Sequence, residues 1–154
     1  MLMRSLRGVF SSGPYYVRIS RTRLNMRDVS SGEIFDTAAR IGLDGANRIA
    51  AVGDMTDAVV RVVEPFNHPR IAIADFLVAS KLLQYGMHQL SRMKWISPAP
   101  IVVIQPDMEL VGGLSELETR ALLELGETAG ARRTFVHYGR VLSDEDVVNL
   151  AGAK

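Results

Sequence analysis

The stretch from residue 97 to residue 138 most constrains how this chain can fold. It contains a β-branched run that follows two prolines, SPAPIVVIQP, then an amphipathic segment, LSELETRALLELGETAGARR, and then a second apolar run, TFVHY. The two runs have the composition of buried strands, and the segment between them has helical spacing. A strand, a helix and a strand with short connections form a crossover unit, so we predict two parallel strands with a helix packed on them.

Both ends of the predicted helix carry sequence signals. Ser115 followed by Glu118 is the pattern of a capping box, in which two side chains satisfy free amides of the first turn. Gly130 is placed to end the helix in a left-handed conformation. Four apolar residues at helical spacing predict the face that packs on the core: Leu117, Ala121, Leu125 and Ala129.

The segments around this unit predict further strands and helices. YYVRIS and RLNMRDV read as two strands joined by a tight turn, EIFDTAARIGL as a third strand and NRIAAVG as a short fourth. Asp75 is placed to cap a helix over FLVASKLLQYGMHQL, whose core stripe is Leu83, Met87 and Leu90. Ser143 is placed to cap a last short helix, and acidic residues in its first turn suit a helix N-terminus.

Composition indicates one globular domain and excludes several classes of function. At 154 residues with 47% hydrophobic content, the chain has enough apolar residues for a core. A formal charge of +1 gives no overall field that would select nucleic acid. The absence of cysteine excludes disulfides and thiolate metal sites, and fits a reducing cytosol. No apolar run reaches the roughly 18 residues that span a bilayer, and arginines interrupt the N-terminus too often for a secretory signal.

Two segments combine apolar and basic residues in the manner of membrane-surface contacts. In residues 1–12, arginines at 4 and 7 lie beside an apolar face formed by Leu2, Met3, Leu6, Val9 and Phe10. In the loop after the first long helix, a basic residue at 94 is interleaved with Met93, Trp95 and Ile96. The alternatives are a frayed or internally docked N-terminus and a tryptophan that folds back onto the core.

Five motifs in order resemble the first domain of the MreB-type bacterial actins, the rod-shape-determining proteins. They are LRGVFS, AAVGD, IADF, SPAPIVVIQP and ELETRALLELGETAGARRTFV. The resemblance implies an α/β fold: a ribonuclease-H-like or actin-like half-domain, with a mixed sheet, flanking helices and a small inserted lobe at about 40–96. It divides the chain into an N-terminal amphipathic segment, 1–12, and an actin-like first domain, 13–154. It also implies that 1–12 and the loop at 93–96 are membrane contacts, as they are in members of the family.

The same resemblance implies that the nucleotide site has degenerated. Family members carry an Asp-Leu-Gly-Thr type loop between the first two strands, where the aspartate supports magnesium and the glycine approaches phosphate. This chain has Val17 and Ile19 at the aspartate and glycine positions, or Arg18 and Ser20 if the register shifts by one residue. Gly139 falls at the glutamate that orients the hydrolytic water in the family. We therefore expect no catalytic residue, bound nucleotide, other cofactor or metal, and the missing first-strand carboxylate also disfavours a ribonuclease-H-type nuclease.

These expectations favour a non-enzymatic, actin-like half-protein, a pseudo-ATPase of the bacterial cell-shape cytoskeleton. It would lie in the cytoplasm, peripheral at the inner face of the cytoplasmic membrane. Its expected partners are a full-length actin-like relative or a second copy, with filament capping or modulation as the role, and no nucleic acid. Two alternatives stay open: a soluble homo-oligomeric adaptor, and a divergent nucleotide-binding protein that uses Arg18 and Arg21.

Overall fold

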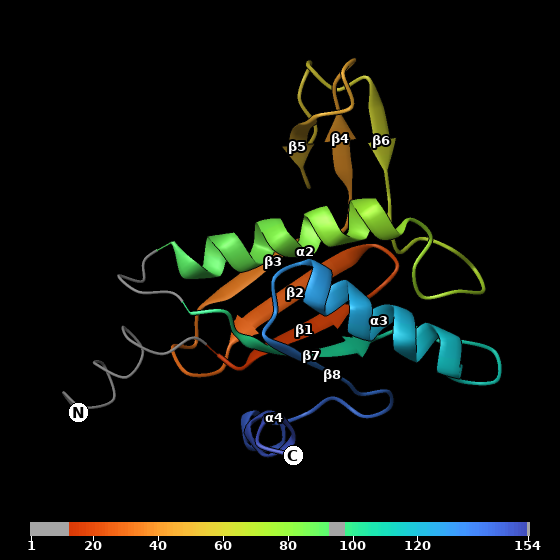
Figure 1. The fold of residues 1–154 in the computed structure, drawn as a ribbon. Helices are drawn as coiled ribbons and strands as arrows, with labels where there is room; N and C mark the ends of the chain where they lie inside the picture. The colour runs from red at the N-terminus through yellow and green to blue at the C-terminus, as the bar shows by residue number, and fades with distance from the viewer. Residues whose placement is uncertain (1–12, 93–97, 154) are drawn as a thin grey trace.

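The computed structural model describes residues 13–92 and 98–153, which form a five-stranded mixed sheet, a smaller three-stranded sheet and three helices (Figure 1). The strand order of the large sheet is β3-β2-β1-β7-β8. The bounds of its strands are β1 Tyr15–Ile19, β2 Arg23–Asp28, β3 Ile34–Ala38, β7 Ile101–Pro106 and β8 Arg133–Val136.

The pairing of the strands confirms the predicted fold class. β1, β2 and β3 form an antiparallel meander, whereas β7 runs parallel to β1 and β8 runs parallel to β7. Tyr15 lies opposite Val102, and Ile101 lies opposite Arg133. The crossover unit predicted over 97–138 is therefore present, and its first strand is the central link between the meander and β8.

Two helices cover one face of the large sheet. Alternate residues of β1, Tyr15, Val17 and Ile19, are buried against α2 (Phe76–Ser91) and α3 (Glu116–Thr128) in the main core. The predicted stripe of α2 is confirmed, because Leu83, Met87 and Leu90 are all buried. The predicted N-caps are confirmed as well, at Asp75 for α2 and at Ser115 with Glu118 for α3.

The predicted core face of α3 is wrong at its first residue. Leu117 is 78% exposed, while the buried positions are Leu122, Leu125, Gly126 and Ala129. Each step of four residues rotates about 40° around a helix, so Leu117 lies about 80° from Leu125, on the side away from Leu122. A helix face predicted only from steps of four residues therefore deviates from the face that packs on the core.

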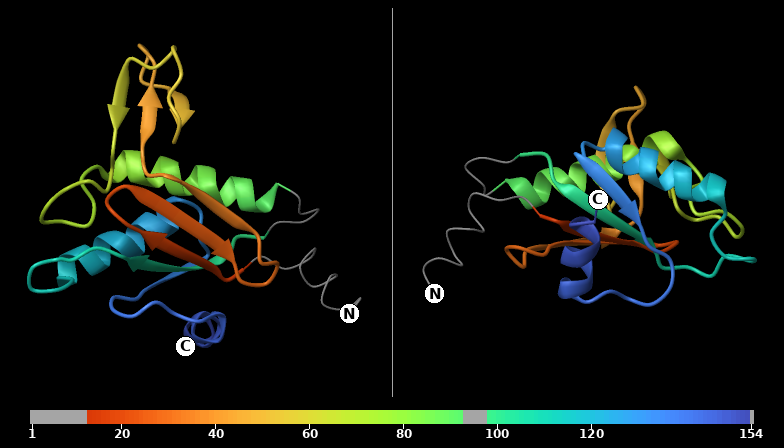
Figure 2. Two further views of the ribbon diagram at one scale, coloured as in Figure 1. Left: turned by 180° about the vertical axis from the view of Figure 1, so that it is seen from behind. Right: turned by 60° about the horizontal axis from the view of Figure 1, so that its bottom comes forward.

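A third helix, α4 (Asp144–Ala151), covers part of the opposite face of the sheet (Figure 2). Its capping box at Ser143 confirms the predicted start of this helix. Tyr16, Val103, Leu142 and Val147 form a second, smaller apolar cluster between α4 and the sheet. The remainder of this face, over β2 and β3, presents the polar side chains of Arg23, Asn25, Arg27 and Asp36, with Ile34 exposed among them.

The second sheet forms a small lobe that projects beyond α2 (Figure 1). Its strand order is β5-β4-β6, with bounds β4 Ile41–Leu43, β5 Ile49–Val52 and β6 Arg61–Val63. The segment predicted as one third strand divides between β3 and β4, because the Arg40 amide bonds back to the Ala38 carbonyl at 2.8 Å and this bend takes the chain out of the large sheet. The small sheet spans 41–63, within the inserted lobe predicted at about 40–96, and α2 packs mainly on β2, β3 and α3.

Candidate functional site

Two depressions meet at Asp107, at the carboxyl ends of the parallel strands, where open α/β sheets usually bind ligands. One has a volume of about 440 Å³ and runs along β1–β3; its lining residues are Arg18, Ser20, Arg23, Asn25, Arg27, Ile34, Asp36 and Asp107. The other, of about 330 Å³, is lined by Pro106, Asp107, Met108, Glu109, Tyr138 and Gly139. This end of the sheet includes the predicted degenerate nucleotide positions.

The alternation of β1 separates those positions between the two faces of the sheet. Val17 and Ile19 are buried in the main core and do not reach the depressions. Arg18 lies on the opposite face, where its guanidinium forms an ion pair with the carboxylate of Asp107. Of these three β1 side chains, only Arg18 reaches the site, and a carboxylate already engages it.

The turn between β1 and β2 is closed by its own hydrogen bonds. The Ser20 hydroxyl accepts a hydrogen bond from the Arg23 amide at 3.0 Å, and the Ser20 amide donates to the Arg23 carbonyl at 2.9 Å. The Arg21 guanidinium donates to the carbonyls of Pro69 at 3.2 Å and Glu109 at 3.1 Å. Arg21 therefore ties together two loops that flank the site.

The wall of the larger depression is also ion-paired. Arg23 donates to a carboxylate oxygen of Asp36 from Nε at 3.0 Å, and this hydrogen bond holds the pKa of Asp36 below its usual range. Arg27 pairs with Asp144 at the start of α4. The arginines that line this depression thus each have a carboxylate partner, which lowers their capacity to hold a further anion.

A buried polar network, which the sequence reasoning missed, positions the segment around Gly139. The side-chain amide of Gln105 donates to the carbonyls of Gly139 at 3.0 Å and Arg140 at 3.1 Å. The Tyr16 hydroxyl donates to Oε1 of Gln105 and accepts a hydrogen bond from the Leu142 amide at 3.0 Å. The sequence signal was Gln105 itself, since a polar residue inside an apolar strand must find partners when it is buried.

Hydrogen bonds of Tyr138 and Asp146 hold the chain on either side of Gly139. The Tyr138 hydroxyl donates to the Met108 carbonyl at 3.1 Å and accepts from the Leu110 amide at 3.2 Å, so it ties the segment after β8 to the segment after β7 in the wall of the smaller depression. Arg140 donates to the carboxylate of Asp146 at 2.8 Å and holds the pKa of Asp146 below its usual range. Within 13–92 and 98–153, no group of three or more His, Cys, Asp or Glu side chains is arranged to hold a metal ion.

The predicted membrane contacts lie outside the described residues. These are Leu2, Met3, Leu6, Val9 and Phe10 in one segment and Met93, Trp95 and Ile96 in the other. The structure does show where the two segments join the fold. No helix among the described residues is long and apolar enough to cross a membrane.

Both junctions lie at the amino ends of the parallel strands, opposite the depressions. The first segment leads into Gly13 and β1, which begins beside Val102 of β7. The second lies between the end of α2 and the start of β7, and Pro100 there accepts a hydrogen bond from the Arg132 amide at 2.8 Å. Figure 1 shows α2 ending on the side where β1 and β7 begin.

Comparison with known proteins confirms the resemblance to MreB. The chain is 28% identical to the cell shape-determining protein MreB of Escherichia coli K12 over 129 residues, which cover 84% of this chain and 32% of that protein. It is 26% identical to MreB of Pasteurella multocida over 166 aligned residues, which cover all of this chain and 44% of that protein. The chain thus spans less than half the length of these relatives. No protein-family model matches it.

Solved structures confirm the fold. MreB5 of Spiroplasma citri bound to ADP superposes with a TM-score of 0.59 at 18% identity, over 80% of this chain and 38% of that one. The same protein bound to AMPPNP superposes with a TM-score of 0.58 at 19% identity, over 83% of this chain and 39% of that one. The chain therefore has the fold of an actin-like half-domain and is related to the MreB cell-shape proteins in sequence.

We predict that Tyr16→Phe lowers the free energy of unfolding by about 1–3 kcal/mol, because it leaves the buried Gln105 oxygen and the Leu142 amide without their partner. Urea unfolding measures the change. Tyr85→Phe is the matched control, since Tyr85 is 38% exposed and keeps its ring contact with Phe35. Equal effects of the two substitutions would show that the network contributes nothing specific.

Proposed function

We propose that this chain is a non-enzymatic, actin-like protein of the bacterial cell-shape cytoskeleton that acts at the cytoplasmic surface of the membrane. Its relation to MreB supports the cytoskeletal part. The observation that carries the membrane part is that both apolar, basic segments join the fold at the same end of the large sheet.

The common location matters because two membrane contacts reinforce each other only when they can reach one plane. Residues 1–12 and 93–97 contain Arg4, Arg7 and Lys94 and no acidic residue. Apolar side chains interleaved with basic ones favour the boundary between lipid headgroups and acyl chains. Segments on opposite ends of the domain would compete for a flat surface, whereas these two can bind it together.

The arrangement of the site supports the absence of ATP hydrolysis. Neither Val17 nor Ile19 has a side chain that could hold the magnesium shell, and both are buried in the core. At the position of the water-orienting glutamate, Gly139 offers only its backbone, and its carbonyl accepts a hydrogen bond from Gln105. Arg18 is paired with Asp107 and Arg21 bridges two loops, which disfavours the alternative of a divergent nucleotide site built on them.

An exposed apolar notch supports contact with another protein. It has a volume of about 190 Å³ and is lined by Ile71, Ala72, Ile73, Leu117, Glu118 and Ala121. Leu117 is 78% exposed, which is costly for a surface that stays in water. We assign this surface to a full-length actin-like relative, whose filaments the chain caps or modulates; a second copy of this chain is the alternative occupant.

The membrane proposal predicts that the intact chain floats with anionic phosphatidylglycerol vesicles. Removal of residues 1–10, or Trp95→Ser, should abolish most of the flotation because each removes one apolar contact. Leu77→Ser is the control, since Leu77 is an apolar residue, 71% exposed, that lies outside both segments. Failure of the intact chain to float would favour the alternative of a soluble homo-oligomeric adaptor.

The capping proposal predicts that the chain shortens filaments of a full-length MreB relative, or lowers their yield, in a sedimentation assay. Leu117→Ser should weaken this effect severalfold, whereas Val148→Ser on α4, which is 50% exposed, should not. An unchanged filament length and yield would contradict capping. The mass of the chain alone in solution can be measured across protein concentration. A mass that rises with concentration, and rises less in the Leu117→Ser variant, would instead indicate a homo-oligomer.

The non-enzymatic proposal predicts no heat in a calorimetric titration with ATP and magnesium, and no phosphate release. If heat is observed, Arg18→Gln and Arg21→Gln test whether these arginines form a divergent site. Loss of the heat in both variants would support the nucleotide-binding alternative.

A further inference from the structure

We propose that Arg132 and Arg133, with Arg92, form a binding site for the anionic headgroups of phospholipids. This inference rests on the proposed membrane function and adds to it the charged contacts within the described fold. The ligand chemistry is a phosphate group carried by a lipid.

The three arginines lie at the end of the sheet where the two membrane segments join. Arg132 and Arg133 stand at the amino end of β8, and the Arg132 amide donates to the carbonyl of Pro100, two residues after the second segment rejoins the described chain. Arg92 follows the last residue of α2, immediately before that segment. A membrane contacted by both segments would therefore come close to all three guanidinium groups.

The side chains of Arg132 and Arg133 are exposed and available to a ligand. Among residues 13–92 and 98–153, neither has a carboxylate within ion-pair distance, whereas Arg18, Arg23, Arg27, Arg48 and Arg140 all do. The adjoining segments cannot neutralise them either, because 1–12 and 93–97 contain no Asp or Glu. The guanidinium groups of Arg132 and Arg133 thus have no ion-pair partner among the described residues, which favours an external anion.

Arg133 is also held in place by an aromatic ring. Its guanidinium carbon lies 4.7 Å from the centroid of the Phe135 ring, two residues along the same strand. Stacking uses the flat face of the guanidinium and leaves its N–H groups at the edge, where they can form paired hydrogen bonds to a phosphate. Arg92 is exposed and donates one hydrogen bond, from Nη1 to Gln89 Oε1 at 3.1 Å, which leaves its other N–H groups available.

A purely structural role for these arginines makes a different prediction. Basic residues near the end of a helix interact favourably with its dipole, and α2 and α3 both end close to them. If that were their whole role, their removal would lower stability and leave lipid binding unchanged. Exposed Glu33 and Glu127 are also near this end, so the site is basic but not free of acidic neighbours.

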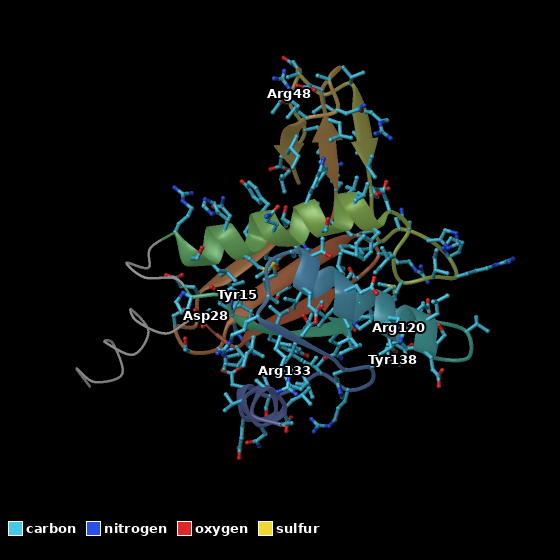
Figure 3. All side chains as sticks on the ribbon, viewed as in Figure 1. Tyr15, Asp28, Arg48, Arg120, Arg133 and Tyr138 are labelled. Atoms are coloured by element: carbon cyan, nitrogen blue, oxygen red, sulfur yellow. The ribbon has the colours of Figure 1, made fainter. Side chains whose placement is uncertain are left out.

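The test compares binding of the intact chain and two double variants to vesicles of phosphatidylglycerol and phosphatidylcholine. Arg132→Gln with Arg133→Gln should lower the affinity about fivefold per arginine, which is the usual contribution of a basic residue near an anionic surface. Arg70→Gln with Arg120→Gln is the matched control. This variant removes the same charge from two exposed arginines outside the proposed site. Arg70 follows Pro69, and Arg120 lies in the first half of α3 (Figure 3). The control should bind within about twofold of the intact chain.

Further measurements make each result decisive. Thermal unfolding establishes that the variants are folded. Arg132→Lys with Arg133→Lys, which keeps the charge but not the paired donors, should bind more tightly than the Gln variant and less tightly than the intact chain. Affinity of the intact chain should fall as salt is added, and less steeply for the Gln variant. In vesicles of phosphatidylcholine alone, the intact chain and the Gln variant should bind equally weakly.

Several outcomes would overturn the inference. If removal of residues 1–10 abolishes vesicle binding while the Gln variant binds like the intact chain, the membrane function stands and the arginine site does not. An equal loss in the Arg70 and Arg120 control would assign the effect to net charge alone. Saturable binding of inorganic phosphate that the Gln variant loses, with unchanged vesicle binding, would assign the site to a soluble anion. Failure of the intact chain to bind anionic vesicles would overturn both proposals.

Discussion

The parallel pairing of β1 with β7 is the interaction on which the rest of the structure depends. It joins an antiparallel meander to a crossover unit, from segments of sequence more than eighty residues apart. Because the pairing is parallel, the amino ends of both strands lie together at one end of the sheet, and their carboxyl ends lie together at the other. The membrane proposal concerns the amino end, and the nucleotide question concerns the carboxyl end.

The two ends differ in how their charges are satisfied. At the carboxyl ends, Arg18 pairs with Asp107, Arg23 with Asp36, and Arg21 with two backbone carbonyls. In the described residues of the amino end, Arg132 and Arg133 have no such carboxylate partner. Closed ion pairs stabilise loops and disfavour an additional anion, whereas exposed unpaired arginines attract one. The contrast argues for a ligand at the amino end and against a nucleotide at the carboxyl end.

Local signals in the sequence were reliable because the interactions behind them are local. Asp75, Ser115 and Ser143 cap helices as predicted, since a capping side chain bonds an amide three residues away. Signals that depended on a distant surface were less reliable. Leu117 had the right spacing for the core of α3 but lies on its exposed side, and the segment 33–43 became two strands in two sheets because the chain bends at Arg40, whose amide bonds back to Ala38.

The sequence by itself determined the kinds of element, their caps and the resemblance to the MreB-type actins, and it led to the expectation of a degenerate nucleotide site, because these follow from residue types and short spacings. Only the tertiary structure decided which residues meet. It buried Val17 and Ile19 while it turned Arg18 toward Asp107, and it connected Tyr16 to Gln105 and Leu142 across 89 and 126 positions of the chain. It also brought the junctions of both apolar, basic segments to one end of the sheet. No pattern along the chain encodes that proximity, because it arises from the parallel pairing of strands that lie far apart in sequence.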